Sequence, residues 1–318
     1  MNEEMIIHQI ASDLHIRPGQ VRTALDLFAS GNTIPFIARY RKEATGTLDE
    51  QQLRQIKEQY EYEETLSNRK DTVRQSIMDQ GLWSNEIKSQ LEKARLLQDV
   101  EDIYLPFKPK KRTKASMARD AGLTPLADLF WNQDIHGPAP EKAAEAYLSK
   151  DVPTVEDAIQ GAANIIAERC SELAPYRRFL RNAFWHDGKL TCSLQEEEEK
   201  SRIYLAYRDF HEAIRRLPSH RILAINRGEN QKALKVNLEV RTDAYISRLC
   251  QMIIKGPSPY KDILESAATD SYKRLICPQI EREIRNELTE KAEKQAIQVF
   301  ASNLRSLLLQ PPFTGQTI

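Results

Sequence analysis

The 318-residue sequence lacks most of the patterns that mark an enzyme. It has only 11 glycines, and it contains neither a Gly-x-x-x-x-Gly-Lys phosphate loop nor a Gly-x-Gly-x-x-Gly dinucleotide motif. Its six histidines show no His-x-x-x-His or carboxylate-flanked spacing of the kind that holds zinc. The adjacent pairs His211-Glu212 and Ser219-His220 are interpreted as capping or surface residues, because neighbours on a helix point in different directions. We therefore expect no catalytic residue, no metal site and no cofactor.

Cysteine and long apolar runs are also scarce. The four cysteines, Cys170, Cys192, Cys250 and Cys277, lie far apart and form no Cys-x-x-Cys pair. No stretch resembles a signal peptide or a membrane-spanning helix. These absences predict a cytoplasmic protein with reduced, structural cysteines and no membrane partner.

Net charge is absent as well, since Lys and Arg together number 46 and Asp and Glu together also number 46. The overall charge therefore predicts no general affinity for nucleic acid, and any such affinity must come from local segregation of charge. The acidic run Glu196–Glu199 is interpreted as a solvated loop, and the alternative is an electrostatic partner for a basic segment.

That basic segment, here called the basic arm, covers residues 108–119, where every charged residue is positive. Tyr104, Leu105 and Phe107 precede it and can hold it against a core, while Pro106 and Pro109 prevent a continuous helix. An ordered concentration of positive charge suits a polyanion, and a solvated loop is the alternative. The candidate phosphate-binding residues of the arm are Lys108, Lys110, Lys111, Arg112, Lys114 and Arg119.

A second basic segment contains Arg39, Arg41 and Lys42 beside Phe36 and Tyr40. Aromatic rings next to positive charge can stack on nucleic-acid bases. We favour the alternative, in which the aromatic residues of both segments are core anchors that leave the basic residues outward.

The pattern of apolar residues predicts a mainly α-helical, multi-helical fold with a minor β-hairpin or short strands. The two longest helices are expected at residues 49–80, begun by a Thr47–Glu50 capping box, and at 279–309, with one apolar stripe along its length. Short strands are expected at 189–194 and 233–240, and their pairing is left open. We expect three parts: a helix-turn-helix-like unit at 1–46, a helical module carrying the basic arm at 47–200, and a helical connector with a short strand at 201–318.

In the helix-turn-helix-like unit, the second helix offers only Gln20, Arg22 and Thr23 for reading bases. Helix pairs of this outline also often pack only against their own protein. We favour that second interpretation over DNA reading.

Three stretches resemble the bacterial Tex family of transcription accessory proteins. They are Tyr-Leu-Pro-Phe-Lys-Pro-Lys-Lys-Arg-Thr-Lys at 104–114 with Ala-Gly-Leu-Thr-Pro-Leu-Ala-Asp at 121–128, the segment Thr33–Gly46, and Leu217–Glu229. The resemblance implies a nuclease-like domain, a helix-hairpin-helix region and an S1 domain beyond residue 318. It also implies that this chain is a fragment and that the S1 domain carries much of the nucleic-acid binding.

These observations predict a non-enzymatic part of a transcription accessory protein that contacts RNA or DNA phosphates without reading sequence. The alternative is a protein-interaction scaffold that docks downstream domains on the transcription or translation machinery. Clustering of Lys108, Lys111, Arg112, Arg39 and Lys42 on one face favours the first function, and a large exposed apolar patch favours the second.

Overall fold

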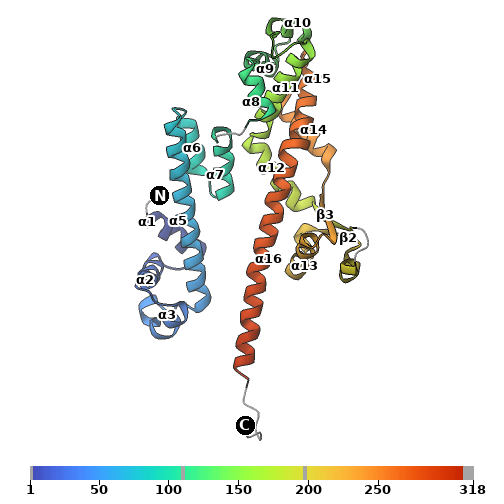
Figure 1. Ribbon diagram of the computed structural model, residues 1–318. Helices are drawn as coiled ribbons and strands as arrows, with labels where there is room; N and C mark the ends of the chain where they lie inside the picture. The colour runs from blue at the N-terminus through green and yellow to red at the C-terminus, as the bar shows by residue number, and fades with distance from the viewer. Residues whose placement is uncertain (1–2, 109–111, 196–198, 311–318) are drawn as a thin grey trace. The chain divides into compact units, whose positions relative to one another are not determined.

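The computed structural model describes residues 3–108, 112–195 and 199–310, and it confirms the expected mainly α-helical fold (Figure 1). The chain forms two compact units, Met1–Lys108 and Pro109–Ile318. The expected three-part division at residues 46 and 200 stays a prediction. Residues 311–318, which follow the second long helix expected from sequence, lie outside the described residues.

The first unit is built along one long helix, α5 (Glu50–Asp79). In Figure 1, α2 and α3 lie beside the first half of α5, and α6 and α7 lie beside its second half. Leu53 and Ile56 of α5 belong to one apolar core, and Val73 and Ile77 belong to another. The other helices of this unit are α1 (Glu3–Asp13), α2 (Pro18–Ala29), α3 (Ile34–Tyr40), α4 (Lys42–Thr45), α6 (Asn85–Lys93), α7 (Leu97–Tyr104) and the 3-10 helix η1 (Leu105–Phe107).

The start of α5 differs from the expected capping box. Thr47 has a φ of 70°, in the left-handed region, so it cannot adopt the extended backbone of an N-cap. Asp49 is the N-cap instead: its Oδ1 accepts a hydrogen bond from the Gln52 backbone N–H at 2.7 Å, and Gln52 Oε1 accepts one from the Asp49 N–H at 3.1 Å. The Thr47–Glu50 prediction is therefore wrong by two residues, while the helix itself is confirmed.

The second unit packs its larger core around α11 (Val155–Ser171), a helix rich in alanine and isoleucine that is buried on most of its surface. The other helices of this unit are α8 (Lys114–Asp120), α9 (Thr124–Asn132), α10 (Pro140–Ala144), η2 (Glu145–Tyr147), α12 (Ala174–Asp187), η3 (Glu199–Tyr207), η4 (Ile214–Arg216), α13 (Ser219–Asn230), α14 (Thr242–Ile253), α15 (Lys261–Asp270), the π-helical η5 (Ser271–Ile276) and α16 (Cys277–Leu308). The π-helical turn ends at Ile276, two residues before Pro278, whose ring and missing N–H disrupt regular α-helical bonding.

A small antiparallel sheet in the second unit has the order β2-β1-β3. The two expected strands are β1 (Lys189–Leu194) and β3 (Leu234–Glu239), and they pair directly. Strand β2 (Asp209–Ala213) was not expected, because its five residues show little apolar alternation. Leu190, Cys192 and Val236 bury one face of the sheet.

Helix α16, with 32 residues, and α5, with 30, confirm the two long helices expected from sequence. The continuous apolar stripe expected for α16 is covered only in its first half, where Ile280, Ile284, Leu288 and Ala292 are buried. From Ile297 onward the apolar side chains of α16 are exposed. Nothing else in the described part of the second unit supplies a core there.

Candidate nucleic-acid interface

Helix α3 places aromatic and basic side chains on the surface of the first unit. Pro35 lies in its first turn, where a missing backbone N–H costs nothing. The helix buries Ile37 and Ala38 in the core shared with the start of α5. Phe36 and Tyr40, which are four residues apart and so lie on one face, remain outside that core.

The exposed rings and the neighbouring cations form what we call the α3–α4 patch, which consists of Phe36, Arg39, Tyr40, Arg41 and Lys42. Phe36 is 38% exposed and Tyr40 is 68% exposed. Their ring centroids lie 5.3 Å apart, and the Arg41 guanidinium lies 5.8 Å from the centre of the Phe36 ring. The expectation that these two rings are core anchors is therefore wrong, because Ile37 and Ala38 supply the buried face instead.

The cations of the patch are available to a ligand. Arg39, Arg41 and Lys42 are exposed, and none of them has a carboxylate within 4.0 Å in the residues that the structure describes. Proteins that bind single-stranded nucleic acid combine cations, which contact phosphates, with exposed aromatic rings, on which bases stack.

Hydrogen bonds from α2 hold the segment that follows the patch. The Gln20 Nε2 donates to the carbonyls of Thr45 and Gly46 at 2.9 and 3.0 Å, which ties the end of α4 to α2. Gly46 adopts a left-handed conformation with φ of 63°, and an added Cβ would lie 3.0 Å from that Gln20 amide. Thr45 is fully buried, and its hydroxyl donates to the Arg41 carbonyl at 3.2 Å.

The same contacts occupy the residues that a helix-turn-helix would use to read bases. Gln20 is bonded to α4, Arg22 forms an ion pair with Glu4, and the Thr23 hydroxyl donates to the Gly19 carbonyl at 2.9 Å. These bonds support the interpretation that α2 packs within its own protein.

The basic arm is only partly described, because Lys110 and Lys111 lie outside the described residues. Lys108 is exposed at the end of the first unit, and Arg112 and Lys114 are exposed at the start of the second. Arg119 differs from them, because it forms an ion pair with Glu168, a carboxylate whose side chain is only 10% exposed. The acidic run that was considered as a partner for the arm falls on residues 196–198, outside the description, and on Glu199.

The aromatic residues before the arm are anchors, as expected. The Tyr104 hydroxyl lies 3.0 Å from the Ser76 hydroxyl, and Phe107 packs on the core around Val73. Ser76 is 23 residues beyond Leu53 on α5, a separation of roughly 35 Å along the helix axis. Because Leu53 shares the α3 core, Lys108 and the α3–α4 patch lie far apart within the first unit, and they do not form one cluster.

Comparison with known proteins decides the family. A family model described as "Tex central region-like" matches residues 136–300, more than half of the chain, and one described as "Tex-like protein N-terminal domain" matches residues 4–78. The chain belongs to the Tex family. The α3–α4 patch lies within the N-terminal match, and the basic arm lies between the two matches.

Three relatives illustrate how similar this chain is to other proteins, in sequence identity and in the share of each chain that is covered. The uncharacterized protein YdcI of Bacillus subtilis is 42% identical over 99% of this chain and 44% of its own length. The transcriptional accessory protein Tex of Neisseria gonorrhoeae is 37% identical over 95% of this chain and 41% of its own length. The human S1 RNA-binding domain-containing protein 1 is 31% identical over the full chain and 33% of its own length. The chain thus spans less than half the length of the curated relatives it matches.

The other described residues of this Tex-family chain were compared with the requirements of a metal site, a reactive thiol and a membrane span. No group of three or more His, Cys, Asp or Glu side chains there is placed to hold a metal ion. Burial raises the pKa of the Cys170 thiol to about 12 and that of Cys192 to about 11, so both are neutral thiols at physiological pH. No helix in the described ranges is long and apolar enough to cross a membrane.

The two histidine pairs considered from sequence are not assembled into catalytic dyads. His211 and Glu212 are neighbours on β2, so they point to opposite faces of the sheet, and Glu212 accepts from Arg221 Nη1 at 2.6 Å. The Ser219 hydroxyl donates to Gln295 Oε1. In the described contacts, His211 does not hydrogen-bond Glu212, and His220 does not hydrogen-bond Ser219.

Proposed function

We propose that this chain is a non-enzymatic, nucleic-acid-associated part of a transcription accessory protein, which contacts phosphates without reading base sequence. The observation that carries the proposal is the α3–α4 patch, where three unpaired cations and two exposed aromatic rings lie within seven residues of the chain. The names of two relatives, a transcriptional accessory protein and an S1 RNA-binding domain-containing protein, support it.

The division of labour in the patch follows from its chemistry. Arg39, Arg41 and Lys42 attract phosphates and release counterions, which gives affinity that is independent of sequence. Phe36 and Tyr40 offer faces on which any base can stack. The basic arm, with Lys108, Lys110, Lys111, Arg112 and Lys114, supplies a second set of phosphate contacts, and Arg119 contributes less because Glu168 already neutralises it.

A salt titration with matched variants tests this function. Affinity for single-stranded RNA and for duplex DNA is measured at several salt concentrations for the parent and for the Arg39→Ala, Arg41→Ala, Lys42→Ala triple variant. Loss of three phosphate contacts should weaken binding to every base sequence alike and flatten the log–log salt slope by about two to three units.

The control variant carries Lys88→Ala, Lys93→Ala and Arg95→Ala, which remove the same charge from exposed positions in the same unit. This control should keep most of the parent's affinity. If both triple variants lose the same affinity, the effect comes from net charge and not from the patch. If the salt slope of the patch variant equals that of the parent, the patch does not contact phosphates.

A protein-interaction scaffold is the second candidate, and the exposed second half of α16 favours it. Six large apolar side chains there, Ile297, Val299, Phe300, Leu304, Leu307 and Leu308, are between 44% and 76% exposed. A contiguous apolar surface of this kind marks a protein interface more often than a free surface.

A further inference from the structure

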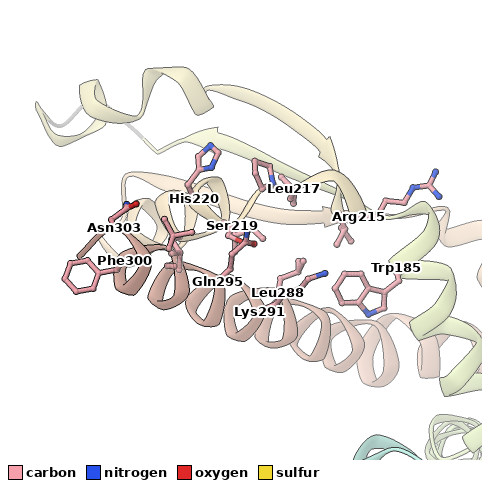
Figure 2. A pocket seen from close by; sticks show the side chains of 16 residues that line it. Trp185, Arg215, Leu217, Ser219, His220, Leu288, Lys291, Gln295, Phe300 and Asn303 are labelled. Carbon is pink, nitrogen blue, oxygen red and sulfur yellow. The ribbon is translucent and has the colours of Figure 1, made fainter. Parts of the chain in front are cut away.

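A groove in the second unit runs beside the middle of α16. It is bounded by the end of α12, by η4 and by the start of α13, and its volume is about 600 Å³. Figure 2 shows Trp185 of α12 near one end and Phe300 of α16 near the other. Along α16 the lining runs from Leu288 to Asn303, which corresponds to roughly 22 Å of helix axis.

The floor of the groove is mostly aliphatic. Its apolar lining residues are Ile214, Leu217, Pro218, Ile222, Leu223, Leu288, Ala296 and Val299, together with the rings of Trp185 and Phe300. The Ser219 hydroxyl donates to Gln295 Oε1, so this polar pair satisfies itself within the lining. At Phe300 the floor continues into the exposed apolar face of α16.

The charged side chains of the lining, Arg215 and Lys291, are both positive. Arg215, His220 and Lys291 line the groove, and its lining includes no aspartate or glutamate. In the described part of the chain none of these three has a carboxylate within 4.0 Å, whereas nearby Arg221 and Arg285 are paired with Glu212 and Glu229. Figure 2 shows Arg215 and His220 at the rim, pointing away from α16.

We infer that this groove binds an acidic amphipathic helix of a partner protein. A helix of about 15 residues matches the length of the groove, and its apolar side chains at i, i+3, i+4 and i+7 would cover the aliphatic floor. Its Asp and Glu side chains would then lie against Arg215 and Lys291. Charge complementarity of this kind selects the partner and speeds its approach.

Nucleic acid fits the groove less well than a peptide does. Bases need aromatic faces close to the cations, and here the two rings lie at opposite ends of an aliphatic surface. The α3–α4 patch, which is in the other unit, has the reverse character. The two surfaces therefore predict different partners, and each can fail independently of the other.

Tryptophan fluorescence can report on the groove directly. The chain has three tryptophans, and replacing Trp83 and Trp131 by Phe leaves Trp185 as the single reporter. The probe is a synthetic peptide of about 15 residues with Leu at helical spacing and Glu elsewhere. One matched peptide carries Lys in place of Glu, and another has the acidic composition with its apolar face broken up.

We expect the acidic amphipathic peptide alone to bind saturably and to shift the Trp185 emission. Arg215→Glu with Lys291→Glu should weaken that binding by about tenfold or more, because attraction becomes repulsion. Lys142→Glu with Lys150→Glu makes the same charge change at exposed positions outside the lining and should leave affinity nearly unchanged. Phe300→Ser should also weaken binding, and since Phe300 is 68% exposed this variant folds like the parent.

Several results would overturn the inference. If the Lys peptide binds as tightly as the acidic peptide, charge complementarity does not select the ligand. If the peptide with the disrupted apolar face binds as tightly, the ligand is not an amphipathic helix. Competition by a single-stranded oligonucleotide assigns the groove to nucleic acid, and a concentration-dependent emission shift without peptide assigns it to a second copy. A shift on removal of residues 311–318 assigns it to the chain's own end, and the absence of peptide binding at millimolar concentration leaves the groove without this partner.

Discussion

Helices α5 and α16 have similar lengths and similar apolar stripes, but the protein covers them differently. The buried residues of α5 run from Leu53 to Ile77, almost its whole length, while those of α16 stop at Ala292. An apolar stripe in a sequence shows that a helix face needs a partner, and it does not show which chain supplies that partner. In α5 the unit's own helices supply it, and in the second half of α16 no described part of the second unit does.

The largest expected difference concerns the ion pairs that tie each long helix to its unit. Glu283 of α16 bonds Arg177 and Arg181 at 2.8 Å each, and Arg177 is only 1% exposed. Glu283→Ala leaves a buried guanidinium without this partner and should destabilise the second unit by about 3–5 kcal/mol. The measurement is the free energy of unfolding from urea denaturation.

The matched change in the first unit is Glu101→Ala, which breaks a pair with Arg69 of α5. Both side chains of that pair are about one-third exposed, so the loss should be below about 1 kcal/mol. Similar losses in the two variants would contradict the difference in burial that we describe for the two helices.

Isoleucine-to-alanine substitutions measure the covering of the two stripes directly. Ile56 of α5 and Ile284 of α16 are at most 1% exposed, so Ile56→Ala and Ile284→Ala should each cost about 2–5 kcal/mol. Ile297, further along α16, is 68% exposed, and Ile297→Ala should stay within about 0.5 kcal/mol. A large loss at Ile297 in denaturation would show that this part of α16 is covered in solution.

These helices also show how far sequence reasoning reaches. Periodicity located α5, α16, β1 and β3, because each is a local pattern of buried residues. Strand β2 was missed because Asp209–Ala213 is held by pairing with β1 and has little pattern of its own. The Thr47 cap failed because the preceding left-handed turn at Gly46 and Thr47 is set by contacts with α2, far away in sequence.

The two candidate surfaces were predictable to different degrees. Arg39, Arg41 and Lys42 were named from sequence, but α3 has two apolar faces, and only packing decides that Ile37 is buried and Tyr40 is exposed. The four-residue spacing of Phe36 and Tyr40 was the available signal that they share a face. The groove could not be found from sequence, because Arg215 and Lys291 are 76 residues apart and meet only through the packing of α13 on α16.

Two tyrosines of the first unit should separate structural from ligand-binding roles. Tyr104 is half-buried, bonds Ser76 and lies under Arg69, so Tyr104→Ala should destabilise the unit by about 1–3 kcal/mol. Tyr40→Ala removes an exposed ring and should leave the unfolding free energy nearly unchanged. It should instead weaken binding of single-stranded RNA by about 1–3 kcal/mol, through the loss of one stacked base.

Fluorescence anisotropy and thermal unfolding on the same two variants check this pair. Tyr40→Phe is the control, since it keeps the ring and should keep the affinity. If Tyr40→Ala binds RNA like the parent, stacking is not part of the interface, and the patch acts through its cations alone.

The two units should also differ in how their stability changes in alkaline solution. Burial raises the pKa of Cys170 from 9.0 to about 12, and burial also raises the pKa of the neighbouring Tyr176 and Tyr272 hydroxyls. Between about pH 9 and 12 the unfolded chain loses the Cys170 proton while the folded chain keeps it, so the second unit loses stability as pH rises.

In the first unit, burial lowers the pKa of Lys70, and this shift changes stability in the opposite direction. Between the lowered pKa of the folded chain and 10.5, the unfolded chain binds more protons than the folded chain does. The contribution of Lys70 to the stability of the first unit therefore rises with pH. Urea denaturation at steps from pH 8 to pH 11 should therefore show the second unit weakening first.

Cys170→Ala and Cys170→Ser differ in stability at pH 8, because only serine buries an extra hydroxyl, but neither side chain titrates in this range. Both should therefore show the same shallower decline than the parent, and a decline parallel to the parent's in both would mean that the Cys170 thiol does not keep its proton on folding.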